Sequence, residues 1–231
     1  MTKPTILILH GWGCDKAVYA GLTAHLSATH TVILPELPGF GETPEPPDAW
    51  GVSDYADCVA ELGVNPDVLL AHSLGCRIAL KLLSDGRLNP RKIIFTGAAG
   101  IKPKRTLSQR VRTRVFKLKK LITPKLSPEK AEALRQKYGS ADYRAASPLM
   151  RQCLVKIVNE DLTNLLAKVP QDTLLIWGEN DDSTPLSDGQ LMEKLLPNAG
   201  LAVMKNAGHY AFLEQPALFL KIIDSYLGDV K

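Results

Sequence analysis

A serine at position 73 stands between an apolar run and a segment with helical spacing. Residues 71–75 read A-H-S-L-G, and residues 68–70 before them are all apolar. Two interpretations are open: the serine caps the following helix, or it is a nucleophile on a sharp turn between a strand and a helix. Such a turn needs small residues two places before and after the serine, usually as G-x-S-x-G. Gly75 fits this form, and Ala71 replaces the first glycine.

A serine nucleophile needs a base, because its hydroxyl is unreactive at neutral pH. On a strand–turn–helix scaffold the base is a histidine that comes last, after an Asp or Glu. His209, in the stretch A-G-H-Y, is the one histidine that follows Ser73. We therefore expect His209 to be the base. The histidines that precede the serine are interpreted as structural or surface groups: His10, His25, His30 and His72.

The acid that orients the base is expected in residues 177–185, which read W-G-E-N-D-D-S-T-P. Three carboxylates compete in this segment, and spacing alone does not separate Asp181 from Asp182. The loop at residues 96–100, T-G-A-A-G, carries no carboxylate, which removes the other common location for the acid.

An acyl-transfer site also needs two fixed N–H donors for the oxyanion of its tetrahedral intermediate. The residue after the nucleophile, Leu74, offers one at the start of a helix. The turn H-G-W-G at residues 10–13 offers the second, because its glycines let the backbone turn inward and present the Trp12 amide. The sequence thus orders an oxyanion turn, a nucleophile, an acid and a base along one chain.

Short apolar segments alternate with longer amphipathic ones, which is typical of a parallel sheet covered by helices on both faces. The predicted strands are 5–9, 31–35, 67–71, 92–96, 173–177 and 201–205. The predicted helices are 16–27, 53–62, 74–83, 187–196 and 217–227. We therefore predict an α/β fold with a doubly wound, mostly parallel sheet of about six strands. Ligands of such sheets bind at the carboxyl ends of the strands.

The connection between the fourth and fifth strands is too long for a single crossover. Its residues read as helices, with Ser127-Pro128 and Ser147-Pro148 as helix starts and Gly139 as a stop. We predict that residues 101–168 form an inserted helical cap. The α/β core then consists of residues 1–100 and 169–231.

The chain resembles the α/β-hydrolase superfamily, in its branch of small serine esterases with a helical cap. The motifs that carry the resemblance are H-G-W-G at 10–13, L-P-G-F-G at 37–41, A-H-S-L-G at 71–75, W-G-E-N-D-D-S-T-P at 177–185 and A-G-H-Y-A-F-L-E-Q-P at 207–216. The family pattern W-G-x-x-D-x-x-x-P implies Asp181 as the acid. Phe40 and Tyr210, within these motifs, are expected at the substrate. Two departures stand out: Ala71 in place of glycine, and a sequence that begins directly at the strand leading to the oxyanion turn.

The resemblance implies a carboxylesterase-type serine hydrolase that cleaves esters of small or medium acyl chains through Ser73, Asp181 and His209. A carbon–carbon bond hydrolase or an acyltransferase would use the same three residues. A hydrolase-fold protein that binds a ligand without turning it over is the alternative of another class. No metal or organic cofactor is expected. The cysteines Cys14, Cys58, Cys76 and Cys153 lack C-x-x-C spacing, which favours free structural thiols.

Composition places the chain among ordinary globular proteins, with 45% hydrophobic and 23% charged residues. No apolar run approaches the roughly 20 residues of a membrane span, and residues 6–9 are too short for a signal-peptide core. We expect a cytoplasmic protein that acts on a small-molecule ester.

One segment is strongly basic: Lys102 to Lys125 holds ten Lys and Arg and no acidic residue. With Phe116 as its single aromatic it lacks the stacking residues of a nucleic-acid site, so no nucleic-acid partner is expected. An alternative makes it a membrane contact, since an apolar helix face lies beneath the basic one. A further hypothesis is that this charge attracts anionic substrates.

Overall fold

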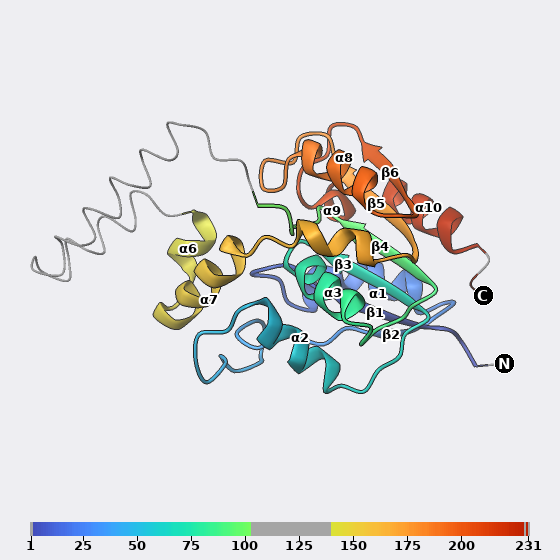
Figure 1. Cartoon of the computed structure of the whole chain (residues 1–231). Helices are drawn as coiled ribbons and strands as arrows, with labels where there is room; N and C mark the ends of the chain where they lie inside the picture. The colour runs from blue at the N-terminus through green and yellow to red at the C-terminus, as the bar shows by residue number, and fades with distance from the viewer. Residues whose placement is uncertain (1, 103–139, 229, 231) are drawn as a thin grey trace, which may run out of the picture.

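The computed structural model describes residues 2–102, 140–228 and 230 (Figure 1). Within these residues, six parallel strands form one sheet in the order β2-β1-β3-β4-β5-β6. The strands are β1 (Thr5–Leu9), β2 (Thr31–Ile33), β3 (Val68–His72), β4 (Lys92–Thr96), β5 (Asp172–Gly178) and β6 (Ala199–Met204). The predicted doubly wound parallel sheet is confirmed.

Helices connect the strands, as the alternating pattern predicts. They are η1 (Ala17–Tyr19), α1 (Ala20–Leu26), α2 (Val52–Ala60), α3 (Leu74–Ser84), α6 (Ala141–Ala145), α7 (Pro148–Asn159), η3 (Thr163–Lys168), α8 (Leu186–Leu195), α9 (Ala211–Glu214) and α10 (Pro216–Leu227). The predicted helix 16–27 begins as a 3₁₀ turn. The predicted strand 31–35 ends at Ile33, because its pairing with β1 stops where Ile33 lies opposite Leu7.

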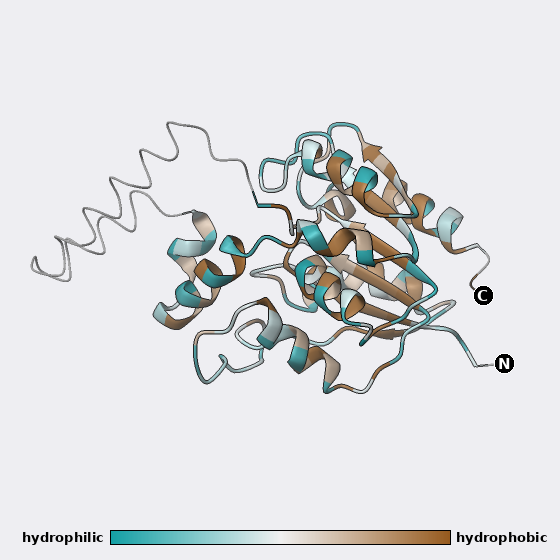
Figure 2. Cartoon of the chain, in the orientation of Figure 1, coloured by the Kyte–Doolittle hydropathy of each residue, from teal (hydrophilic) through white to brown (hydrophobic). Residues whose placement is uncertain are grey.

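Both faces of the sheet are buried, which explains why the strands are apolar nearly throughout. Successive strand residues enter opposite hydrophobic clusters. Leu7 and Leu69 pack on the face covered by α2, α3 and α8, whereas Ile6 and Val68 pack on the face covered by α1 and α10. In Figure 2 the strands are accordingly brown and the outer sides of the helices carry the teal colour.

The described part of the predicted cap is helical. Ser147 accepts a hydrogen bond from the Met150 N–H at 3.1 Å and Pro148 is the first residue of α7, so the predicted helix start at Ser147-Pro148 is confirmed. In Figure 1, α6 and α7 lie beyond the end of the sheet opposite the chain termini. The expected features at Ser127-Pro128 and Gly139, and nearly all of the basic segment 102–125, lie outside the described residues.

Candidate active site

The predicted site residues all follow the carboxyl ends of parallel strands. Trp12 comes after β1, Ser73 after β3, Asp181 after β5 and His209 after β6. Because every strand runs in the same direction, these ends share one edge of the sheet. The topology therefore gathers residues that are up to 197 positions apart in the sequence (Trp12 to His209).

Ser73 sits on a strained turn between β3 and α3. Its backbone has φ 49° and ψ −109°, a left-handed conformation that residues other than glycine rarely adopt. Such strain persists only where the surroundings hold it, and it is concentrated at functional sites. Gly75 makes the turn possible, since a Cβ at this position would lie 2.1 Å from the Leu9 carbonyl oxygen of β1.

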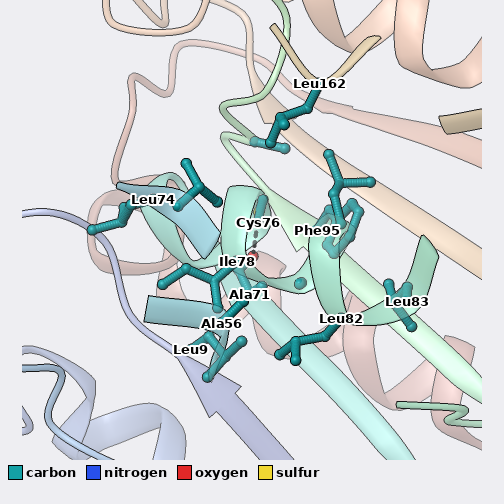
Figure 3. Close-up of a cluster of buried hydrophobic side chains, with 14 of the residues drawn as sticks. Leu9, Ala56, Ala71, Leu74, Cys76, Ile78, Leu82, Leu83, Phe95 and Leu162 are labelled. Carbon is teal, nitrogen blue, oxygen red and sulfur yellow. Dashed lines mark hydrogen bonds between the residues drawn. The ribbon is translucent and has the colours of Figure 1, made fainter. Parts of the chain in front are cut away.

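Ala71, the departure from the usual glycine, is accommodated in the hydrophobic core. Figure 3 shows it among the buried side chains of β1, α3 and β4, including Leu9, Ile78 and Phe95. The Cys76 thiol donates a hydrogen bond to the Ala71 carbonyl oxygen at 3.1 Å, which links the strand to the first turn of α3. The alanine methyl group thus packs beneath the turn and leaves the positive φ of Ser73 in place.

Asp181, and not Asp182, contacts the histidine. The Nδ1 atom of His209 lies 2.8 Å from Oδ2 of Asp181, whose side chain is completely buried, while Asp182 is exposed. An ionised carboxylate can only accept, so His209 donates from Nδ1 and keeps the lone pair of Nε2. Gly97, just after β4, lies close to the same ring: a Cβ there would lie 3.0 Å from Nδ1 and 3.2 Å from Cε1 of His209.

Three further donors fix the Asp181 carboxylate. Oδ1 accepts from the backbone N–H groups of Ser183 at 2.9 Å and Thr184 at 2.8 Å, and Oδ2 accepts from the Thr184 hydroxyl at 2.9 Å. Burial raises the pKa of Asp181, but the hydrogen bonds from His209 and Thr184 outweigh burial, and the net pKa is lowered. Asp181 is therefore held as an anion against the His209 ring.

The two expected oxyanion donors are available. Neither the Trp12 N–H nor the Leu74 N–H takes part in a hydrogen bond among the described residues. Leu74 is the first residue of α3, where backbone N–H groups have no partner within the helix. The buried ring of His10 holds the turn that precedes Trp12. Its Nε2 accepts a hydrogen bond from the Leu37 N–H at 2.9 Å, and its Nδ1 contacts the Gly11 carbonyl oxygen.

A cavity of about 420 Å³ opens at this edge of the sheet. Ser73, Leu74, Trp12 and His209 line it together with residues of α6, α7 and the loop that leads into α8. Tyr210, one of the two expected substrate contacts, also lines the cavity. Phe40, the other, is not among the described lining residues. It is buried and packs its ring edge-on against Trp12, with ring centroids 4.9 Å apart.

Arg77, Thr184 and Asp188 are among the cavity residues that were not predicted from the sequence. Thr184 belongs to the S-T-P stretch after the acid, so the motif itself carried a signal for it. Arg77 lies four residues after Ser73, at a position where the sequence predicts only a helix. The pKa of the Asp188 carboxyl is raised by burial and by the charge of Asp181.

The earlier histidines occupy structural or surface positions. His10, His30 and His72 are buried, and exposed His25 contacts Asp224 at 2.8 Å. Among the described residues, no group of three or more His, Cys, Asp and Glu side chains is placed to hold a metal ion. In the same part of the chain, no helix has both the length and the apolar character that a membrane span requires.

Comparison with known proteins identifies the family to which this chain belongs. A model described as "Alpha/beta hydrolase family" matches residues 6–222. The pimeloyl-[acyl-carrier protein] methyl ester esterase of Aromatoleum aromaticum is 30% identical over 244 residues, covering 94% of this chain and 95% of that protein. The 2-hydroxymuconate semialdehyde hydrolase of Pseudomonas putida is 24% identical, covering 96% and 86%.

Solved structures agree on the fold. An esterase from Exiguobacterium antarcticum superimposes with a TM-score of 0.76 at 24% identity, covering 98% of this chain and 92% of that one. MenH from S. aureus superimposes with a TM-score of 0.73 at 21% identity, covering 100% and 95%. The parallel sheet and the family match over most of the sequence lead to one conclusion: this chain is a member of the α/β-hydrolase family and has esterases among its relatives.

Proposed function

We propose that this protein hydrolyses carboxylic esters of small or medium acyl chains, with Ser73 as nucleophile, His209 as base and Asp181 as the orienting acid. The observation that carries the proposal is the 2.8 Å contact between His209 Nδ1 and buried Asp181, at the strand edge where Ser73 adopts its left-handed backbone. This contact leaves Nε2 of His209 as the basic atom, which is what a serine nucleophile requires.

In the first half of the reaction, Ser73 Oγ bonds to the ester carbonyl carbon and its proton passes to His209 Nε2. The carbonyl oxygen becomes an oxyanion between the N–H groups of Trp12 and Leu74. The bond from the carbonyl carbon to the alcohol oxygen then breaks, and His209 returns the proton to the leaving alcohol. The acyl group remains on Ser73 as an ester.

In the second half, water attacks the acyl-enzyme and releases the acyl group from Ser73. His209 takes a proton from the water as its oxygen bonds to the acyl carbon, and the second oxyanion forms in the same place. The bond to Ser73 Oγ breaks, His209 returns the proton to Oγ, and the carboxylic acid departs. Asp181 keeps its charge throughout and stabilises the imidazolium that forms in each half.

The relatives favour the ester over other bonds, because several of them are named as methyl ester esterases and the one at 30% identity spans nearly the whole chain. The Pseudomonas putida relative, whose name describes hydrolysis of 2-hydroxymuconate semialdehyde, supports a second candidate, carbon–carbon bond hydrolysis by the same residues. An acyltransferase would differ only in the acceptor of the second half-reaction.

One substrate panel tests these proposals. Esters of increasing acyl length and one carbon–carbon hydrolase substrate are assayed with the wild type and with Ser73→Ala, with and without an added alcohol acceptor. We expect the shorter esters to be hydrolysed and Ser73→Ala to lose on the order of 10⁴ to 10⁶ in kcat. A fluorophosphonate should label Ser73 stoichiometrically in the wild type.

Other outcomes redirect the proposal. Preferred turnover of the carbon–carbon substrate, or of an alcohol acceptor over water, would select one of the other two reactions. Ester hydrolysis at nearly the wild-type rate by Ser73→Ala would rule out the serine mechanism. Binding without turnover or labelling in the wild type would indicate a ligand-binding protein.

A further inference from the structure

A buried arginine lines the same cavity as the proposed nucleophile. Arg77 lies one helical turn after Ser73 on α3, about 6 Å along the helix axis at 1.5 Å per residue. Only 5% of its surface is exposed, and it shares the cavity with Ser73 and His209. Arginine is among the residue types least often buried unless it is paired, so its partners matter.

The guanidinium of Arg77 has one hydrogen-bond partner among the described residues. Its Nη1 donates to the Glu160 carbonyl oxygen at 2.8 Å, a neutral acceptor just past the end of α7. Among the described residues, no other hydrogen bond of this side chain is formed. A guanidinium carries five N–H groups in a planar fork, so the N–H groups of Nε and Nη2 are without a described partner in a side chain that lines the cavity.

The two described acidic side chains whose charges act on Arg77 are engaged with other partners. The Glu160 carboxylate pairs with Lys81 at 2.7 Å, and Asp161 accepts from the Thr163 hydroxyl at 2.6 Å. Both carboxylates act on Arg77 through their negative charge. Burial lowers the pKa of Arg77, and these two charges partly offset that lowering. A buried charge without a counter-ion is unfavourable, and a carboxylate that accepts two N–H groups of the fork would relieve it.

We propose that Arg77 is a specificity residue that binds a second carboxylate, carried by the acyl part of the substrate. This inference rests on the proposed ester hydrolysis and narrows its substrate class to half-esters of short dicarboxylic acids. Leu154 and Ile157 of α7 line the cavity near the Glu160 contact and supply an apolar wall for the intervening methylene groups.

The charges around the cavity favour the acyl side for this carboxylate. The leaving alcohol has to receive its proton from His209, so the alcohol part lies toward that residue. Asp188 lines the cavity from α8, and the charge of Asp181 makes that region unfavourable for another anion. Asp142, the other acid that lines the cavity, is exposed on α6. Arg77 approaches from α3 and contacts Glu160 at the end of α7.

The test compares two methyl esters that differ in charge but hardly in shape: monomethyl glutarate, which carries a carboxylate, and methyl pentanoate, which ends in a methyl group. Methanol release is measured for wild type, Arg77→Met and Arg77→Lys. Lys81→Met is the matched control, because it removes a positive charge one turn further along α3 and disturbs the same Glu160. We expect Arg77→Met to lose about 10- to 100-fold more in kcat/KM for monomethyl glutarate than for methyl pentanoate.

Arg77→Lys keeps the charge without the fork, so it should fall between wild type and Arg77→Met. Lys81→Met should affect the two esters equally. If Arg77→Met and Arg77→Lys each slowed both esters by the same factor, Arg77 would have only a structural role in joining α3 to the end of α7, and the proposal would be wrong.

A binding measurement separates this proposal from the proposed function. Calorimetric titration of Ser73→Ala with glutarate, and with butanoate as the monoanion control, requires no turnover. We expect glutarate to bind at least ten times more tightly than butanoate, and Ser73→Ala/Arg77→Met to lose that preference. Absence of ester turnover by the wild type, with the glutarate preference of Ser73→Ala intact, would overturn only the hydrolase proposal, whereas the absence of a preference in Ser73→Ala would overturn the role of Arg77.

Discussion

The imidazole of His72 lies against that of His209, with ring centroids 4.8 Å apart and ring planes inclined by 47°. His72 is completely buried, and its Nδ1 donates to the Thr96 carbonyl oxygen at 3.0 Å. Burial and the neighbouring His209 lower the pKa of His72 to about 3. His72 therefore remains neutral at physiological pH and supports the His209 ring without competing for its proton.

This burial predicts a pH-dependent stability that one substitution removes. In the unfolded chain His72 titrates near its ordinary pKa of 6.5, whereas in the folded chain it does so at about 3. Between these values the unfolded state binds more protons, so the contribution of His72 is complete above pH 6.5 and is lost as the pH falls toward 3. His72→Phe should reduce the slope of unfolding free energy against pH by up to about 1.4 kcal/mol per pH unit.

Urea unfolding at neutral pH and at about pH 5 measures this slope in wild type and variant. His25→Phe is the control, because His25 is an exposed histidine paired with Asp224. Equal slopes for wild type and His72→Phe would mean that His72 is not the group that the acid transition protonates.

The choice between two adjacent carboxylates gives a prediction about catalysis. Asp181→Asn replaces the acceptor of the His209 Nδ1 proton with a group that can donate, which favours the wrong tautomer, and should lower kcat by about 10⁴. Asp182→Asn, in the exposed neighbour, should change kcat far less. Initial rates of wild type and both variants are compared on the ester of the panel that the wild type hydrolyses fastest. A larger effect at Asp182 would show that the loop after β5 turns differently in the working enzyme.

The Thr184 hydroxyl should contribute to stability only while Asp181 is ionised. Thr184→Val removes the 2.9 Å donor to Oδ2, and a hydrogen bond to a charged group contributes about 1.5 to 3 kcal/mol. Because the pKa of Asp181 is lowered by folding, its contribution is present above its ordinary value of 3.8 and is lost as the pH falls through the folded pKa. The difference between wild type and Thr184→Val should therefore be largest at neutral pH and shrink in acid.

Thr184→Ser keeps the hydroxyl and serves as the matched control. Both variants are compared with wild type by urea unfolding across the acidic range. A stability loss for Thr184→Val that stays constant from neutral to acidic pH would assign the effect to packing of the side chain instead of to the Asp181 charge.

The sequence predicted the sheet and the order of the site residues because each depends on local signals. Buried parallel strands appear as short apolar runs, and the turn around Ser73 needs Gly75 at a fixed spacing. Arg77 escaped prediction for a physical reason: its partner is the carbonyl of Glu160, 83 residues away, and only the folding of the α7–η3 segment onto α3 brings the two together. Phe40, expected at the substrate, packs its ring edge-on against Trp12 of the cavity, a contact that depends on side-chain packing and not on local spacing.

The two small residues that flank Ser73 should respond very differently to exchange. A Cβ on Gly75 would lie 2.1 Å from the Leu9 carbonyl oxygen, and Leu9 cannot retreat because β1 is paired with β3 at Ala71. Gly75→Ala should therefore cost about 3 kcal/mol or distort the turn and abolish turnover. Ala71→Gly restores the common form of the motif but removes a methyl group from the cluster drawn in Figure 3.

Ala71→Gly should accordingly lose only about 1 to 2 kcal/mol of stability, from the buried methyl group and from the added freedom of the unfolded chain. Its kcat should stay within a few-fold of wild type, since the positive φ of Ser73 depends on the clearance at Gly75. Urea unfolding and ester turnover, measured on both variants, test the pair together. An active Gly75→Ala, or an inactive but stable Ala71→Gly, would place the steric requirement of the turn on the strand side of Ser73 and not on the helix side.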